Sequence, residues 1–288
     1  MIIVLTGPTG SGKSELAIEL AKRIDGEIVN ADAFQVYQGL TIATAAPNEE
    51  MKRKVPHHLY GHIPLNERYD IAKYQIEARR VIKDILERGK TPIMVGGSGL
   101  YLRAALYDYD LSVDTSSVDL SPYETMTNEE LHAILEKLDP EEAKKLPKEN
   151  RRRVLRDIAI CLAAKESKTS LLAKQNHEPI YPTKFFALSK EREILYAHLD
   201  ERVEKMFDDG LLRETLPLIE QYGENAPAFQ AIGVKELFPY LRHEISLEEA
   251  KNQIKLDTRH YVKRQETFFR HQFPTVYVTS LEEICALL

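Results

Sequence analysis

The stretch Gly7-Pro8-Thr9-Gly10-Ser11-Gly12-Lys13-Ser14 decides how this 288-residue chain folds. It fits the pattern G-x-x-x-x-G-K-[ST] and lies between an apolar run, Met1–Thr6, and a segment with helical spacing, Glu15–Ile24. The glycines allow backbone N–H groups to curl around a phosphate, and the amino end of the helix adds a favourable dipole. We expect Lys13 to neutralise phosphate oxygens and the Ser14 hydroxyl to hold Mg²⁺. The motif predicts a bound di- or triphosphate with Mg²⁺ as cofactor, and it leaves the reaction open.

Strands and helices alternate outward from this loop. Further strands are expected at Glu27–Ala31, Pro92–Val95, Lys184–Leu188 and Thr275–Val278, and helices at Ile71–Arg88, Glu191–Tyr222 and Leu247–Phe269. The alternation predicts an α/β fold of the P-loop NTPase-like type, with a doubly wound parallel sheet.

The pattern changes in the middle of the chain. A loop rich in Ser, Thr and Asp precedes two helical stretches, Asn128–Leu138 and Arg151–Ala164. We therefore expect a smaller helical insertion, residues 110–169, in a core formed by residues 1–109 and 170–288.

The charge balance excludes a generally cationic coat for nucleic acid, because 39 Lys and Arg stand against 45 Asp and Glu. The basic residues are bunched, however. Arg152, Arg153 and Arg156 share helix faces at spacings of three and four, and a second basic ridge covers residues 251–271. Each cluster fits contact with RNA phosphates, and the alternative for each is a solvated helix face.

The composition also bears on the compartment. The longest apolar runs are far short of the roughly 20 residues that a membrane span requires. The chain has only two cysteines, Cys161 and Cys285, and no recognisable signal peptide. These features predict a cytoplasmic protein without membrane contact.

Asp32 is the candidate general base. It follows the predicted second strand, whose carboxyl end should lie near the phosphate loop. A carboxylate there can take a proton from a nucleophile that attacks the phosphate-bearing substrate. The alternative is an aspartate that caps a turn, but the nearby Gln35 and Tyr37 favour a substrate site. Arg202, on the helix after the strand Lys184–Leu188, is a candidate diphosphate ligand, and Arg192 or Arg213 would serve nearly as well.

Several further motifs continue in a recognisable order. They are Asp32-Ala33-Phe34-Gln35-Val36-Tyr37, Val55-Pro56-His57-His58, Gly96-Gly97-Ser98-Gly99-Leu100-Tyr101, Arg152-Arg153-Val154-Leu155-Arg156, Gln230-Ala231-Ile232-Gly233-Val234-Lys235-Glu236 and Lys263-Arg264-Gln265-Glu266-Thr267-Phe268-Phe269-Arg270. With the phosphate loop, they resemble the tRNA dimethylallyltransferases, also called tRNA isopentenyltransferases, over nearly the whole chain. The chain differs from the family pattern at Ala33, where Ser is usual, and at Ala43 and Ala46, where Gly and Lys are usual.

The resemblance implies a prenyl transfer from dimethylallyl diphosphate to N6 of the adenosine just 3′ of the tRNA anticodon, carried out by a monomer. The phosphate loop would hold the diphosphate, Lys13 and Ser14 would stabilise it as it leaves, and Asp32 would accept the N6 proton. The adenosine would be flipped out of its stack. The segments that would contact the tRNA anticodon arm lie in the insertion and in three short motifs of the core. The residues concerned are Asp32, Ala33, Phe34, Gln35, Ser98, Arg152, Arg153, Arg156, Lys263 and Arg264.

Three alternatives remain at this point. An adenylate isopentenyltransferase would share the fold and modify free AMP, although a mononucleotide does not need the basic helices. A small-molecule kinase would also place an acid after strand two, although no Arg-rich lid is evident. A non-catalytic RNA-binding module would fit the changes at Ala33 and Ala46.

Overall fold

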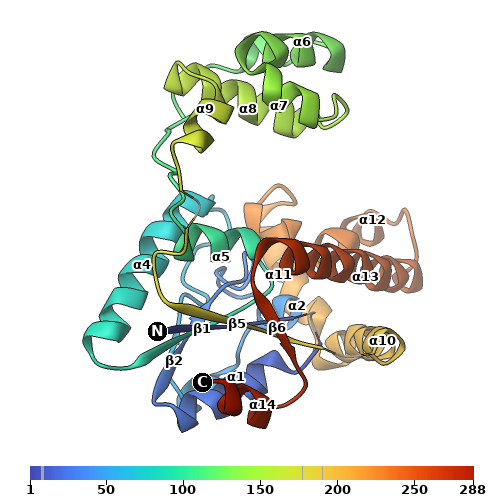
Figure 1. The fold of residues 1–288 in the computed structure, drawn as a ribbon. Coiled ribbons are helices and arrows are strands. Elements are labelled where there is room, and N and C mark those ends of the chain that lie inside the picture. Colours follow the sequence, from blue (N-terminus) through green and yellow to red (C-terminus); the bar gives the residue numbers. More distant parts are fainter. Residues whose placement is uncertain (8–9, 177, 190) are drawn as a thin grey trace. The chain divides into compact units, whose positions relative to one another are not determined.

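The structure is a computed structural model that describes residues 1–7, 10–176, 178–189 and 191–288. Its centre is a parallel sheet in the order β3-β2-β4-β1-β5-β6 (Figure 1). The strands are β1 (Ile2–Thr6), β2 (Gly26–Asn30), β3 (His57–His58), β4 (Thr91–Val95), β5 (Thr183–Leu188) and β6 (Thr275–Val278). All residues of β1 and β2 are buried, and in β4 only Thr91 is partly exposed, because helices cover both faces of the sheet.

Each face of the sheet has its own helical cover. α1 (Lys13–Arg23) and α14 (Leu281–Leu287) lie on one face, and α4 (Ile71–Glu87) and α5 (Gly99–Leu106) lie on the other (Figure 1). On the α1 face, Leu20 packs with Ile3 and Ile93 in the core. On the α4 face, Tyr74 stacks on Tyr101 with 4.0 Å between ring centroids. This arrangement is the predicted doubly wound α/β fold.

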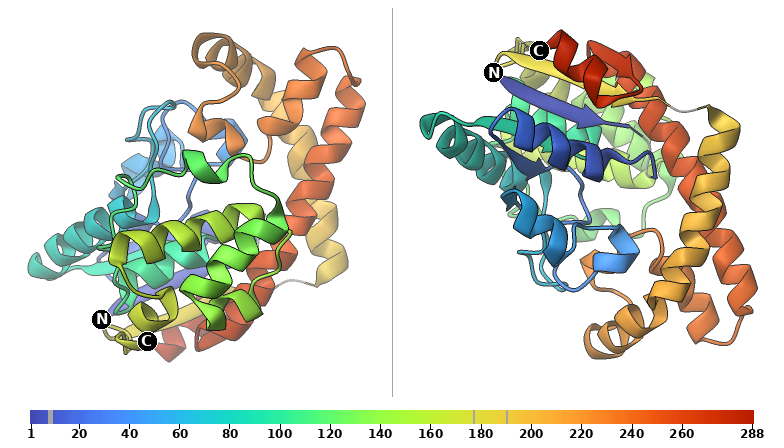
Figure 2. Two further views of the ribbon diagram at one scale, coloured as in Figure 1. Left: turned by 90° about the horizontal axis from the view of Figure 1, so that it is seen from above. Right: turned by 90° about the horizontal axis from the view of Figure 1, so that it is seen from below.

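α10 (Arg192–Asp209) and α13 (Leu247–Gln272) run side by side at one end of the sheet (Figure 2). The sequence predicted one helix over Glu191–Tyr222, and this is wrong. Gly210 has φ of +105° and ends α10, and α11 (Leu211–Tyr222) starts immediately after it. A residue with that φ cannot continue a right-handed helix, and glycine adopts it at little cost.

Several short elements complete the core and were not predicted. They are α2 (Thr41–Thr44), α3 (Glu49–Lys54), η2 (Pro227–Gln230), η3 (Lys235–Leu237) and α12 (Phe238–Leu241). β3 is equally short, and it pairs with β2 through Ile28 and Val29. Elements of two to six residues carry too little periodicity for a pattern to reveal.

A separate helical unit comprises residues Tyr107–Pro179. It contains η1 (Ser121–Tyr123), α6 (Asn128–Leu138), α7 (Pro140–Lys145), α8 (Arg151–Ala164) and α9 (Lys168–Ala173). Its own core is formed by Leu131, Leu135, Ala143, Leu146, Val154 and Ile158. The unit begins three residues before and ends ten residues after the expected insertion, residues 110–169, and α9 belongs to it because this helix packs against α7 and α8.

Among the described residues, no helix is long and apolar enough to cross a membrane.

Candidate functional site

Three chain segments meet where the central strands end. β1 leads into the phosphate loop, β2 into the Asp32 loop, and β4 into the turn that begins at Gly96. Thr6 Oγ1 donates a hydrogen bond to the Gly96 carbonyl at 3.0 Å. A Cβ atom on Gly96 would lie 2.2 Å from the carbonyl carbon of Ala31, so only glycine permits this approach. The carboxyl edge of a parallel sheet is where ligands bind in folds of this class.

The described part of the phosphate loop has the backbone of an anion site. Gly10 and Gly12 have φ of +77° and +90°, and α1 begins at Lys13 without a side-chain cap. The first N–H groups of α1 therefore have no capping side chain as a partner. The buried Ser11 Oγ also has no hydrogen-bond partner among the described residues. Pro8 and Thr9, which were predicted to contribute to this loop, lie outside the described residues.

The carboxylate of Asp32 is held by its own loop. Its Oδ1 accepts a hydrogen bond from the Phe34 N–H at 2.9 Å, and the Asp32 N–H donates to Asn30 Oδ1 at 2.8 Å. Burial raises the pKa of Asp32, while the backbone N–H groups and the nearby charges of Lys13 and Arg202 oppose that rise. A raised pKa makes the ionised carboxylate a better proton acceptor.

Lys13 and Arg202 both interact electrostatically with the Asp32 carboxylate. Burial lowers the pKa of Lys13 to about 8, with Asp32 opposing the decrease and Arg202 adding to it. Burial likewise lowers the pKa of Arg202, and Asp32 again opposes it. The fold thus brings together Lys13, Asp32 and Arg202, three predicted site residues from distant parts of the sequence. Two cations next to one carboxylate leave a positive charge that suits a diphosphate.

A cavity of about 240 Å³ opens beside these groups. Polar side chains contribute one part of its wall and apolar side chains the other. The lining residues are Asp32, Phe34, Ala43, Thr44, Leu199, Arg202, Val203, Met206, Gln230, Ala231, Ile232, Lys235, Ile254, Thr258, Tyr261 and Arg264. A cavity of mixed character suits a ligand with a charged head and an apolar tail.

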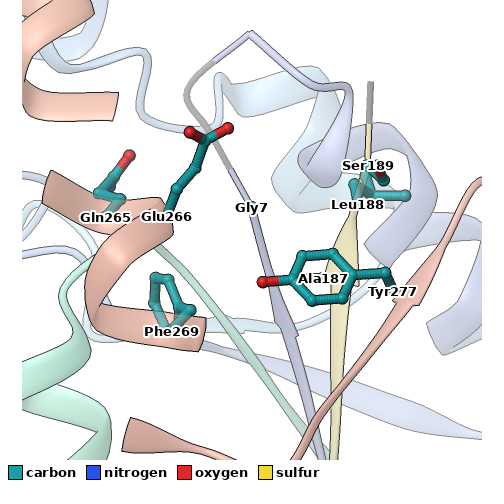
Figure 3. Close-up of a pocket in the computed structure, with 8 residues that line it drawn as sticks. All are labelled: Gly7, Ala187, Leu188, Ser189, Gln265, Glu266, Phe269 and Tyr277. Atoms are coloured by element: carbon teal, nitrogen blue, oxygen red, sulfur yellow. The ribbon is translucent and has the colours of Figure 1, made fainter. Parts of the chain in front are cut away.

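A second, much smaller cavity of about 40 Å³ lies beside Gly7. Figure 3 shows that Glu266 and Phe269 reach it from α13 and Tyr277 from β6. A Cβ atom on Gly7 would lie 3.0 Å from the Leu188 carbonyl oxygen, so the strands are closely packed here. This space has room for a few water molecules and is too small for a nucleotide or prenyl substrate.

Gln35 and Ser98, two predicted tRNA ligands, make internal hydrogen bonds. Gln35 Nε2 donates to the carbonyl oxygens of Thr44 at 2.9 Å and Ala45 at 3.1 Å. Ser98 Oγ accepts from the Ala33 N–H at 3.0 Å. Both side chains therefore organise the Asp32 loop. Phe34 lines the cavity.

The basic residues divide into free and paired groups. Lys263 and Arg264 are exposed and border an open groove on α13 with Phe268 and His271. Three other cations of the predicted basic ridge are paired. Lys251 and Lys255 pair with Glu204 at 2.7 and 2.5 Å, and Arg259 pairs with Asp200. The two carboxylates of α10 thus offset part of the charge of these three cations.

In the helical unit, Arg152, Arg153 and Arg156 are exposed on α8, and Arg156 donates to Thr115 Oγ1 at 3.0 Å. Asp157, the next residue on α8, pairs with Lys168 at 2.9 Å. The cluster therefore keeps its positive charge.

Comparison with known proteins shows the family to which this chain belongs. The family model described as IPP transferase matches residues 35–272. The chain belongs to the IPP transferase family. A tRNA dimethylallyltransferase of Anoxybacillus flavithermus is 42% identical over 275 residues, which cover 95% of this chain and 88% of that protein. The corresponding protein of Leuconostoc mesenteroides is 41% identical over 277 residues and covers 95% and 91%.

Solved structures of IPP transferases have the same fold. A tRNA isopentenylpyrophosphate transferase from Staphylococcus epidermidis superposes with a TM-score of 0.74 at 36% identity and covers 99% of this chain and 97% of that one. A eukaryotic dimethylallyltransferase, described as acting on tRNA, gives a TM-score of 0.86 at 30% identity and covers 98% and 75%.

Some residues of this IPP transferase site were missed by the sequence analysis. Leu199, Val203 and Met206 line the cavity on either side of Arg202. Their spacing of three and four residues along α10 puts them on one helix face, a signal that the sequence contained. Tyr261 and Thr258 reach the same cavity from α13, and only the packing of α13 against α10 shows this.

Proposed function

We propose that this chain transfers a dimethylallyl group from dimethylallyl diphosphate to N6 of an adenosine in tRNA, at the position 3′ of the anticodon. One observation carries the proposal: Asp32 and Arg202 share a cavity with a wall of apolar side chains, close to an uncapped phosphate loop. Relatives called tRNA dimethylallyltransferases, at about 40% identity over most of the chain, support the same reaction. A tRNA substrate also supports the cytoplasm as the compartment.

The transfer forms one bond, breaks one bond and releases one proton, and the site has a group to accept that proton. The N6 nitrogen attacks the allylic carbon, the bond between that carbon and the diphosphate oxygen breaks, and diphosphate leaves. The Asp32 carboxylate takes the proton that N6 releases. Lys13 and Arg202 stabilise the negative charge that develops on the leaving diphosphate. The apolar residues Val203 and Ile254, both buried, surround the prenyl group and exclude water.

The residues present fit a magnesium diphosphate. Among the described residues, no three His, Cys, Asp or Glu side chains cluster as a metal site. Mg²⁺ commonly keeps water and phosphate ligands and takes only one or two from protein, so the Ser14 hydroxyl is a sufficient anchor. When bound, the ion would neutralise diphosphate charge. Ser14 would orient it, and the backbone N–H groups of Gly12 and Lys13 would bind phosphate oxygens.

The exposed cations favour an RNA acceptor over free AMP. Lys263 and Arg264 lie at the cavity and its neighbouring groove, and the second cluster lies on α8. A mononucleotide needs neither cluster, whereas an anticodon arm offers phosphates to both. Asp32, Ala33 and Phe34 would contact the flipped adenosine, and Arg152, Arg153 and Arg156 would contact the RNA backbone.

The test supplies the protein with Mg²⁺ and labelled dimethylallyl diphosphate. Separate reactions contain a tRNA anticodon stem-loop, AMP, or the same stem-loop with guanosine at the target position. The proposal predicts label in the adenosine-containing RNA alone. Label in AMP and not in RNA would contradict it and support adenylate prenylation.

A further inference from the structure

α2 lacks a cap from its own sequence neighbours. This four-residue helix, Thr41–Thr44, begins after Leu40, whose side chain cannot accept a hydrogen bond. Glu214 of α11 supplies the acceptors, although it lies 172 residues after Ile42 and 171 after Ala43 in the chain (Figure 1 labels both helices). Its Oε2 accepts from the Ile42 N–H at 2.7 Å and its Oε1 from the Ala43 N–H at 2.9 Å. Both carboxylate oxygens therefore bind backbone N–H groups of α2.

Glu214 has no ion-pair partner within the part of the chain that the structure describes. It is only partly exposed. Burial raises its pKa, and the N–H groups of α2 oppose that rise. The stabilisation of this carboxylate thus comes from α2 itself.

The other end of α2 is tied to the Asp32 loop. Gln35 Nε2 donates to the Thr44 and Ala45 carbonyl oxygens at 2.9 and 3.1 Å. Between the two attachments, Ala43 and Thr44 face the cavity that holds Asp32. α2 is therefore a short wall segment fixed at its amino end by Glu214 and at its carboxyl end by Gln35.

We infer that Glu214 is a positioning residue for the acceptor side of the site. It holds α2 so that Ala43 and Thr44 shape the cavity and Gln35 keeps the Asp32 loop in place. The hydrogen bonds of Glu214 in the described structure go to the backbone of α2 and not to the phosphate loop. The inference rests on the proposed function, since it assigns the adenosine to the side of the cavity formed by α2 and the Asp32 loop.

The experiment compares wild type with Glu214→Ala, Glu214→Gln and a control, Glu220→Ala. Glu220 is exposed on the same helix and makes no hydrogen bond or ion pair in the described structure. Single-turnover prenylation of a tRNA anticodon stem-loop gives the rate, and titration with dimethylallyl diphosphate and Mg²⁺ without RNA gives donor affinity. Thermal unfolding of each variant shows that the rates are measured on folded protein.

Glu214→Ala should slow the single-turnover rate roughly 10- to 100-fold, because small displacements of reacting groups have effects of this size. Donor affinity should stay within about twofold of wild type. Glu214→Gln should lie between Ala and wild type, since glutamine keeps one acceptor oxygen and places an NH₂ donor where the second carboxylate oxygen of Glu214 accepts a backbone N–H. Glu220→Ala should behave as wild type.

Two results would overturn the inference. One is a Glu214→Ala variant that is folded and as fast as wild type. The other is a loss of donor affinity as large as the loss of rate, because Glu214 would then act on the whole site. Failure of the proposed function is separate: wild type and Glu220→Ala would leave the RNA unmodified while still binding the donor.

Discussion

The hydroxyl oxygen of Ser98 accepts a hydrogen bond from the backbone N–H of Ala33 at 3.0 Å. The Ser98 N–H in turn donates to the Ala31 carbonyl oxygen, also at 3.0 Å. These two bonds join the turn after β4 to the loop that follows β2. The loop that carries Asp32 is thus fixed by a residue 66 positions later in the sequence.

Substitution of Ser98 by Ala removes the acceptor of the Ala33 N–H. We expect the prenylation rate to fall about 10-fold, because Asp32 is held less precisely. Donor affinity should be unchanged, since these two hydrogen bonds of Ser98 join it to the segment that carries Asp32 and not to the phosphate loop. Single-turnover kinetics and donor titration measure the two quantities. Equal rates for wild type and Ser98→Ala would show that the Asp32 loop does not need this bond.

Glu236 makes stability depend on pH. Its Oε2 accepts from the Gly233 N–H at 2.8 Å, and burial raises its pKa from 4.5 to about 7. A carboxyl with a higher pKa in the folded state holds its proton better there. The contribution of Glu236 to the free energy of unfolding is therefore complete below the unfolded pKa of 4.5. This contribution is lost as pH rises through the folded pKa of about 7.

The Glu236→Gln variant should remove that loss. Glutamine keeps an acceptor for the Gly233 N–H and cannot ionise. We expect the variant to be more stable than wild type by about 1–3 kcal/mol at slightly alkaline pH, and similar at acid pH. Denaturant unfolding across this range measures the difference. Parallel pH profiles for the two proteins would show that Glu236 is not the group responsible.

RNA affinity should depend on the free cations of α13 and not on the paired ones. Charge-neutralising substitution of Lys263 and Arg264 should weaken tRNA binding and reduce the slope of log affinity against log salt by about 1 for each phosphate contact. The matched control replaces Lys251 and Lys255, which pair with Glu204. Binding measured at several salt concentrations distinguishes the two pairs. A larger loss of tRNA affinity in the control variant would contradict the prediction that Lys263 and Arg264, and not Lys251 and Lys255, bind the RNA.

The sheet and its ligand edge were predictable because the signals are local. The apolar run of β1, the phosphate loop and the start of α1 follow one another within 23 residues. The place of Asp32 just after β2 then puts a carboxylate at the same edge, and the structure brings it near Lys13 and Arg202. Family membership, inferred from the motifs, is also confirmed.

The remaining features depend on contacts between distant residues. The basic ridge was predicted from the spacing of Lys251, Lys255 and Arg259, but their partners Glu204 and Asp200 come from α10. Gln35 was predicted to contact RNA, and the structure shows that its amide also reaches α2, which is too short for a pattern to reveal. The cap that Glu214 gives to α2 joins residues 171 and 172 positions apart, so no local signal exists.

The Asp32→Asn variant is the sharpest test of whether the Asp32 carboxylate accepts the proton from the adenosine. Asparagine retains Oδ1 as an acceptor for the Phe34 N–H, so the loop keeps its hydrogen bond while the side chain loses its basicity. The measurement is the single-turnover rate of label transfer from dimethylallyl diphosphate to the adenosine of an anticodon stem-loop, at saturating donor and RNA. We expect a rate lower by roughly 10²- to 10⁴-fold, with donor and RNA affinities close to wild type. A rate within a few-fold of wild type would contradict the assignment of Asp32 as the proton acceptor.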